Sequence, residues 1–362
     1  MKMWKRITTL LLTVVVSVGL VACGGTEETS LESDGSSEET MVTEEEVTDL
    51  TEEPTKEELV ETTETESLLN DAEADFVVVE DELDREVRIP RHPQRVLALT
   101  SAAMQALIEI EMPLVGKVEE YKIDEDYVDL PSVGKASEIN IEAVYALEPD
   151  LIIAANRFHA SMTEELERSG AAVFFFDPDK IGDIPIVDMV PYLAEFFEKE
   201  ELAEAHVDHM EEVASELEKQ VHEQTDIETG VILQDGDTIR AAQTASGYGS
   251  LLTMLDIENI VPADLPGSKK SPFVPFDVEE IIVADPDLIL ITASSNDPDS
   301  NKATLEKFKN DPKWSELSAV KNNNLIMLPF SVNANRATPE DMLRTTAEVI
   351  LMTDPRDGNS IG

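Results

Sequence analysis

The sequence contains a single cysteine, Cys23, among 362 residues. One thiol cannot form an internal disulfide, so a fold held together by disulfide bonds is excluded. Cys23 follows three basic residues and an apolar run over residues 7–22, which is shorter than an ordinary membrane span. The tetrapeptide Leu20-Val21-Ala22-Cys23 is typical of the site where a lipoprotein signal peptide is removed and the cysteine is diacylated. We therefore expect residues 1–22 to be a signal peptide and Cys23 to be a lipid anchor on the outer face of the cell membrane. The alternative is an uncleaved anchor with an incidental cysteine.

Basic residues are also scarce. The chain has 27 Lys and Arg against 77 Asp and Glu, which gives a formal net charge of -50. A nucleic-acid partner requires a basic surface to meet its phosphates, so this class of partner is excluded, and adhesion to anionic lipid is disfavoured for the same reason.

The segment 24–75 has almost no aromatic residues and only one basic residue, Lys56, against twenty acidic ones. It is rich in Glu, Thr and Ser and cannot bury a hydrophobic core. We expect residues 23–75 to be a disordered acidic tether that holds a folded domain away from the membrane.

From Phe76 onward the composition changes, and about 287 residues remain, enough for two lobes. Short β-rich runs alternate with helical stretches, which predicts an α/β fold built on largely parallel sheets. The runs are Arg95–Thr100, Leu151–Ala155, Val173–Asp177, Val231–Gln234, Leu288–Thr292 and Leu325–Pro329.

An internal repeat indicates that the two lobes are alike. Residues 140–153 align without gaps with residues 277–290. In each copy Asn or Asp is placed to cap a helix, a Glu follows in the first turn, and Pro-Asp ends the helix before a buried strand.

Residues 199–224 contain neither Pro nor Gly, and apolar residues recur there at helical spacing. A helix of this length would extend about 39 Å, enough to connect two lobes. We predict Rossmann-like lobes over residues 76–198 and 225–362, joined by one rigid helix over residues 199–224.

Several motifs resemble one known family. They include Ile89-Pro-x-x-Pro93-x-Arg95-Val96, the two Pro-Asp repeats, and Trp314-x-x-Leu317-x-Ala319-Val320-Lys321-Asn322. The chain resembles the ABC-importer solute-binding proteins with a helical backbone (class III), which serve ferric siderophores, haem and cobalamin. Further matches, Leu114-Val-Gly-Lys117 and Pro329-Phe330-Ser-Val-Asn-Ala334-Asn335 among them, are similar to the haem-receptor lipoproteins of Gram-positive bacteria.

The resemblance implies a non-enzymatic receptor that holds its ligand between two lobes and delivers it to an ABC permease and its ATPase. It implies that Glu142 and Glu279, the first-turn glutamates of the repeat, dock onto the permease. Their alternative role is charge compensation at a helix N-terminus. The cargo implied is an iron chelate, haem or a ferric siderophore, and no cofactor of the protein's own is required. We expect a monomer.

The haem receptors hold iron with a Met from one lobe and a His from the other, and matching places these positions at Ser137 and Ser294. Neither serine is a plausible ligand of haem iron. His159 is the substitute that we expect, with Met104, Tyr121 and Tyr248 as other candidates. Met104 is as easily explained by a place in the core, and Tyr248 by a turn.

Other residues near predicted strand ends are candidates for lining the cleft. Basic side chains that can meet anionic groups of the cargo are Arg157, Lys269 and Lys270. Polar and aromatic candidates for the cleft wall are Asn333, Asn335, Arg336, Phe158 and Phe273.

Other functions account for the residues of this sequence less well. A zinc or manganese receptor would need converging His and carboxylate ligands, but His206 and His209 fall on the acidic helix, where a solvated face is expected. A cobalamin receptor shares the fold and remains an alternative. Enzyme motifs such as Gly-x-Ser-x-Gly and His-Glu-x-x-His are missing. A structural or adhesive lipoprotein would leave the repeat unexplained.

Overall fold

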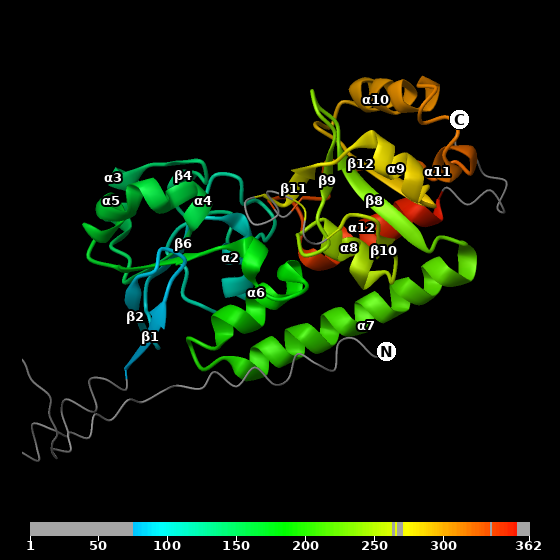
Figure 1. Ribbon diagram of the computed structural model, residues 1–362. Helices are drawn as coiled ribbons and strands as arrows, with labels where there is room; N and C mark the ends of the chain where they lie inside the picture. Colours follow the sequence, from blue (N-terminus) through cyan, green and yellow to red (C-terminus); the bar gives the residue numbers. More distant parts are fainter. Residues whose placement is uncertain (1–74, 263–264, 266–270, 334, 353–362) are drawn as a thin grey trace, which may run out of the picture. The chain divides into compact units, whose positions relative to one another are not determined.

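The computed structural model describes residues 75–262, 265, 271–333 and 335–352 (Figure 1). Cys23, the predicted signal peptide, the predicted tether up to residue 74 and the lysines 269 and 270 lie outside these residues. Among the described residues, none of the helices combines the length and the apolar composition that crossing a membrane requires.

The N-terminal half of the described chain is built on a three-stranded parallel sheet of order β3-β6-β7. All five residues of β6 are buried, as expected for a parallel strand that is covered on both faces. An antiparallel hairpin, β1–β2, precedes the sheet. The elements of this half are β1 (Phe76–Glu80), β2 (Glu86–Pro90), β3 (Val96–Ala98), α2 (Ser101–Glu109), β4 (Gly134–Lys135), β5 (Glu138–Ile139), α3 (Ile141–Leu147), β6 (Leu151–Ala155), α4 (Asn156–His159), η2 (Ala160–Met162), α5 (Thr163–Glu167), β7 (Ala172–Phe176), η3 (Pro178–Lys180) and α6 (Pro185–Ala194).

The C-terminal half contains a six-stranded sheet of order β11-β9-β8-β12-β13, in which β10 also pairs with β8. Strands β8, β10, β12 and β13 are parallel, whereas β9, near one edge, runs antiparallel to both of its neighbours, β8 and β11. The elements are β8 (Thr229–Gln234), β9 (Arg240–Ala242), α8 (Gly249–Met254), β10 (Glu258–Asn259), β11 (Phe273–Pro275), α9 (Val278–Ala284), β12 (Leu288–Thr292), α10 (Pro298–Asn310), α11 (Ser318–Lys321), β13 (Leu325–Leu328) and α12 (Pro339–Leu351).

The prediction of an α/β fold with largely parallel sheets is confirmed for the centres of both sheets. The antiparallel direction of β9 has a local cause. Only residues 235–239 separate β8 from β9, and so short a connection can only return the chain alongside the strand it has left.

One long helix, α7 (Glu200–Gln224), follows the first half and precedes the second, and Figure 1 draws it in green as the longest helix. It contacts α2 and α6 of the first half and α8 and α12 of the second. Its buried residues recur every three or four positions and form one stripe: Ala203, His206, Met210, Val213, Ala214, Leu217 and Val221.

The two copies of the internal repeat form the same structure. Asn140 caps α3 by accepting a hydrogen bond from the Ala143 amide, and Asp277 caps α9 by accepting one from the Glu279 amide. Each helix ends in a residue with left-handed backbone, Glu148 at φ 44° and Asp285 at φ 45°. Similar sequences therefore produce similar helix starts and ends.

The Asp of each Pro-Asp pair has a role that the sequence alone did not reveal. Asp150 accepts hydrogen bonds from the amides of Gln94 (2.6 Å) and Arg95 (3.0 Å), just before β3. Asp287 accepts from the amides of Glu228 (3.1 Å) and Thr229 (3.0 Å), at the start of β8. In both halves this carboxylate fixes the start of the neighbouring parallel strand.

Candidate functional site

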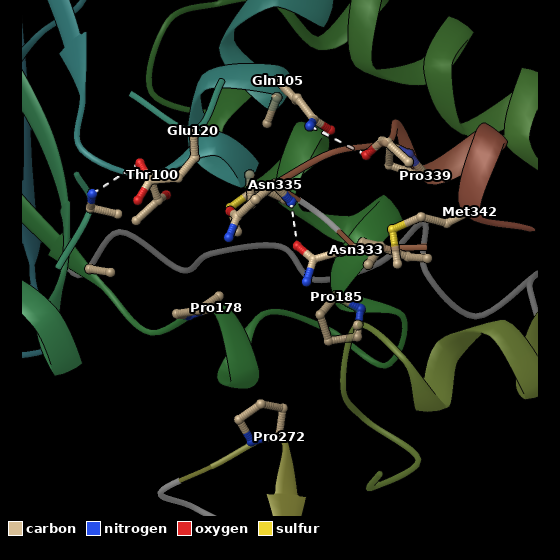
Figure 2. Close-up of a pocket in the computed structure, with 18 of the residues that line it drawn as sticks. Thr100, Gln105, Glu120, Pro178, Pro185, Pro272, Asn333, Asn335, Pro339 and Met342 are labelled. Carbon is tan, nitrogen blue, oxygen red and sulfur yellow. Dashed lines mark hydrogen bonds between the residues drawn. The ribbon is translucent and has the colours of Figure 1, made fainter. Parts of the chain in front are cut away.

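A cavity of about 400 Å³ is lined by residues from both halves of the described chain. Its volume lies within the range of about 300–1,000 Å³ that is usual for small-molecule sites. Figure 2 shows residues of both halves facing this space. The lining comprises Thr100, Ala102, Gln105, Ala106, Glu109, Glu120, Ala136, Ser137, Ala155, Arg157, Phe158, Pro178, Pro185, Ile186, Met189, Val190, His206, Gly247, Tyr248, Pro272, Asn333, Asn335, Ala337, Pro339 and Met342.

The topology explains where the cavity lies. Thr100 follows β3, Arg157 follows β6, Pro178 follows β7 and Asn333 follows β13. Parallel strands end at the same edge of a sheet, and ligands of open α/β folds bind at that edge. The cavity therefore occupies the position that the strand pattern predicts.

The two sides of the cavity are also linked directly. Gln105 of α2 donates a hydrogen bond from Nε2 to the carbonyl of Ala337, which precedes α12 (3.4 Å; Figure 2). Thr100 caps α2 by accepting from the Ala103 amide, which fixes the start of the helix that carries Gln105.

Six of the predicted site residues line the cavity: Ser137, Arg157, Phe158, Tyr248, Asn333 and Asn335. The Arg157 guanidinium lies 4.8 Å from the ring centre of Phe158, whose side chain is 42% exposed. The hydroxyl of Tyr248 accepts a hydrogen bond from Asn333 Nδ2 (3.4 Å), and burial raises the pKa of this phenol. These residues supply a polar and aromatic wall, and their ligand roles stay predictions.

Other predicted residues lie away from the lining. Tyr121 is only 1% exposed and packs in the N-terminal core, as does Met104. Phe273 is buried against the ring of Tyr248, 5.2 Å between centres. Ser294, in the segment after β12, is exposed and not part of the lining. Two further candidates are Arg336, which is exposed with its guanidinium over the ring of Phe330, and Lys270, which lies outside the described residues.

His159 requires a correction, because the structure gives it a structural place. It is completely buried, its Nδ1 accepts a hydrogen bond from the Ala155 amide (3.1 Å), and its Nε2 donates to the Ala136 carbonyl (2.7 Å). Burial lowers the pKa of this imidazole, which keeps it neutral. Both nitrogens are occupied, so His159 has no lone pair for a metal and is not the iron ligand that the sequence suggested.

Sequence reasoning missed several lining residues, chiefly Glu109, Met189, His206 and Met342. His206 was expected on a solvated face with His209, but only His209 is there, paired with Glu340 at 2.8 Å. A signal for His206 did exist. It lies three residues after Ala203 and four before Met210, in step with the buried stripe of α7.

The charged groups of the lining are few. Glu109 Oε2 lies 3.5 Å from His206 Nδ1, and hydrogen bonding to His206 is the main reason that the pKa of Glu109 is lowered. Glu120 accepts a hydrogen bond from the Ala136 amide (3.2 Å). Within the described part of the chain, no group of three or more His, Cys, Asp or Glu side chains is placed to hold a metal ion.

Glu142 and Glu279, the predicted docking residues, lie in the first turns of α3 and α9. Both are exposed. Glu279 forms a surface ion pair with Lys313 (3.0 Å). The two carboxylates thus occupy equivalent places in the two copies of the repeat and are accessible to a partner.

The chain is similar in sequence to known proteins. The sequence model of the family described as periplasmic binding protein matches residues 96–332. The high-affinity heme uptake system protein IsdE of Staphylococcus aureus (strain MRSA252) is 25% identical over 246 residues, which is 67% of this chain and 82% of IsdE.

Solved structures have the same fold. The structure of S. aureus IsdE complexed with heme has a TM-score of 0.56 and 22% identity, covering 71% of this chain and 98% of that one. S. aureus SirA complexed with staphyloferrin B has a TM-score of 0.59 and 18% identity, covering 76% and 96%. With the family model matching nearly two thirds of its length and with the fold of class III solute-binding proteins, the chain belongs to the periplasmic binding protein family.

Proposed function

We propose that this protein is the extracellular substrate-binding lipoprotein of an ABC importer and that it captures an iron complex, haem or a ferric siderophore. The observation that carries the proposal is the cavity lined from both halves of the chain at the ends of the parallel strands. Its lining is mainly apolar with a few polar groups, which suits a large, partly apolar ligand. The relatives are transport proteins that bind solutes, which supports a receptor with no enzymatic activity.

Haem is the cargo that we favour. IsdE is named for heme uptake, and it is similar to this chain over two thirds of the chain's length. The lining also contains His and Met side chains, which are common ligands of haem iron. A ferric siderophore is the second candidate, because SirA, a structural neighbour, is complexed with staphyloferrin B.

The remaining parts of the proposal concern anchoring and delivery. A lipid on Cys23 and a tether over residues 23–75 would hold the lobes 76–198 and 225–362, joined by helix 199–224, at the outer face of the membrane. Glu142 and Glu279 would dock onto the permease of the importer, whose ATPase supplies the energy. The exposure of both side chains supports this role.

A haemin titration of the full-length chain in detergent tests the function. We expect a saturable one-to-one shift of the Soret band beyond that of a detergent blank. Ferric siderophores and cobalamin are titrated in parallel and followed by intrinsic fluorescence. Binding of a siderophore without a haem shift would move the cargo to the second candidate, and binding of none of the three would contradict the proposal.

A further inference from the structure

His206 carries a buried nitrogen without a partner at the candidate site. Its side chain is 6% exposed, and its Nε2 atom has neither solvent contact nor a hydrogen bond. Among the described residues only Ser101 Oγ shares this condition. Buried polar atoms are nearly always paired, so an unpaired one that belongs to a cavity-lining residue is a candidate for binding a ligand.

The neighbouring carboxylate determines which ring nitrogen is free. Glu109 Oε2 lies 3.5 Å from His206 Nδ1, so in the neutral form of the ring this carboxylate favours the tautomer with its proton on Nδ1 and a lone pair on Nε2. A histidine whose second nitrogen faces a carboxylate is the usual arrangement of a metal-binding imidazole, because the carboxylate holds the ring and makes it more basic.

Met189 and Met342 are the thioether side chains of the lining, and the iron ligands that the sequence suggested are poorly suited or absent from it. Ser137 lines the cavity but is a poor iron ligand, and Ser294 is not in the lining. His159 has both nitrogens occupied. Burial raises the pKa of Tyr248, so its side chain stays a phenol. Among the described lining residues, His206 is the remaining nitrogen ligand.

We propose that His206 coordinates the iron of haem through Nε2 and that Glu109 positions its ring. This inference rests on the proposed function with haem as cargo. The lone pair of Nε2 forms the bond to ferric iron and displaces a water molecule from it, while the proton stays on Nδ1 and no electron is transferred. Because Nε2 is covered in the ligand-free chain, haem entry must displace the side chains that cover it.

Leucine at position 206 provides the main test. His206→Leu places an apolar side chain on the buried stripe of α7 and removes an unpaired polar atom, so we expect the variant to fold. His209→Leu is the matched control, because His209 lies on the same helix, has the same kind of carboxylate partner and does not line the cavity. Both full-length variants are titrated with haemin beside the wild type.

We expect His206→Leu to lose haem affinity by at least about 100-fold, the upper end of the effect of removing a residue that merely supports a metal ligand. His209→Leu should bind as the wild type does. In His206→Ala, added imidazole should restore the wild-type Soret spectrum, which a purely structural role would not produce. Glu109→Gln should shift the spectrum and weaken binding less than His206→Leu.

Two results would overturn the inference, and they differ in what survives. If the wild type binds haem and His206→Leu keeps its affinity and spectrum, the iron ligand lies elsewhere and haem remains the cargo. If the wild type binds no haem, the choice of haem in the proposed function fails together with this inference. Circular dichroism and thermal unfolding of each variant establish that the fold is intact.

Discussion

The two copies of the repeat share one scaffold and differ at the end of the strand that follows. Helices α3 and α9 have equivalent caps, and Asp150 and Asp287 each fix the start of a neighbouring strand. After β6, however, the chain turns into α4, which places Arg157 and Phe158 in the cavity wall, whereas Ser294 after β12 is exposed and outside it.

This difference separates the residues that build each half from those that line the cavity. The repeated residues satisfy backbone groups at helix and strand starts, and that task is the same in both halves. The residues after the strand ends differ between the two halves. In the C-terminal half the cavity wall is supplied instead by Tyr248 and by Asn333 and Asn335, from segments outside the repeat.

The largest expected effect on stability concerns the carboxyl end of β6, in the N-terminal half. His159→Ala leaves the Ala155 amide and the Ala136 carbonyl without partners and removes a buried ring, so we expect the free energy of unfolding to fall by about 3 kcal/mol. Urea denaturation of the variant measures this. Ser294→Ala, in the exposed segment that follows β12, should change stability by less than about 0.5 kcal/mol. Similar losses in both variants would contradict the comparison.

A smaller effect tests the shared scaffold. Asp150→Ala and Asp287→Ala each remove a carboxylate that accepts two backbone hydrogen bonds. We expect each to lower the free energy of unfolding by about 1–2 kcal/mol, reduced from the buried value because the groups are partly exposed. The same denaturation series measures both. A large loss in one variant and none in the other would show that the repeat is not equivalent in its energetics.

The pH dependence of stability sharpens the same contrast. Burial lowers the pKa of His159 below its ordinary value of 6.5, so between these two pKa values the unfolded chain binds a proton that the folded chain does not. Stability should therefore fall as the pH decreases from about 6.5 through the lowered folded pKa. Thermal melts at a series of pH values follow this loss. His159→Gln should have a flatter profile over this range, and an unchanged slope would exclude His159 as the cause.

The smallest effect on stability is expected at the exposed first-turn glutamates of the repeat. Glu142→Lys and Glu279→Lys change exposed side chains, so melting temperatures should stay close to the wild-type value. If both residues dock onto the permease, uptake of the cargo by cells should be impaired by each change and abolished by both. Uptake of labelled haem measures this, with Glu280→Lys on α9 as a neighbouring control. Normal uptake by the double variant would remove the docking role.

Much of the scaffold could be predicted from the sequence because the relevant signals are local. The helix predicted over residues 199–224 is observed as Glu200–Gln224, and the strand predicted at Leu288–Thr292 has those bounds. Periodicity, capping residues and runs of β-branched side chains act within a few positions of one another. The short strands β4, β5, β9, β10 and β11 were missed, since two or three residues carry too little pattern, and the five-residue strands of the β1–β2 hairpin were missed as well.

The residues of the cavity were likewise predictable only in part. The sequence by itself determined the strand ends, and with them the place of Arg157, Phe158 and Asn333 beside the cavity. Only the tertiary structure decided that His159 has both nitrogens occupied while His206 keeps one unpaired beside Glu109. The reason is physical: the availability of a side chain depends on burial and on hydrogen-bond partners brought together from distant elements, whereas periodicity reports only the element to which a residue belongs.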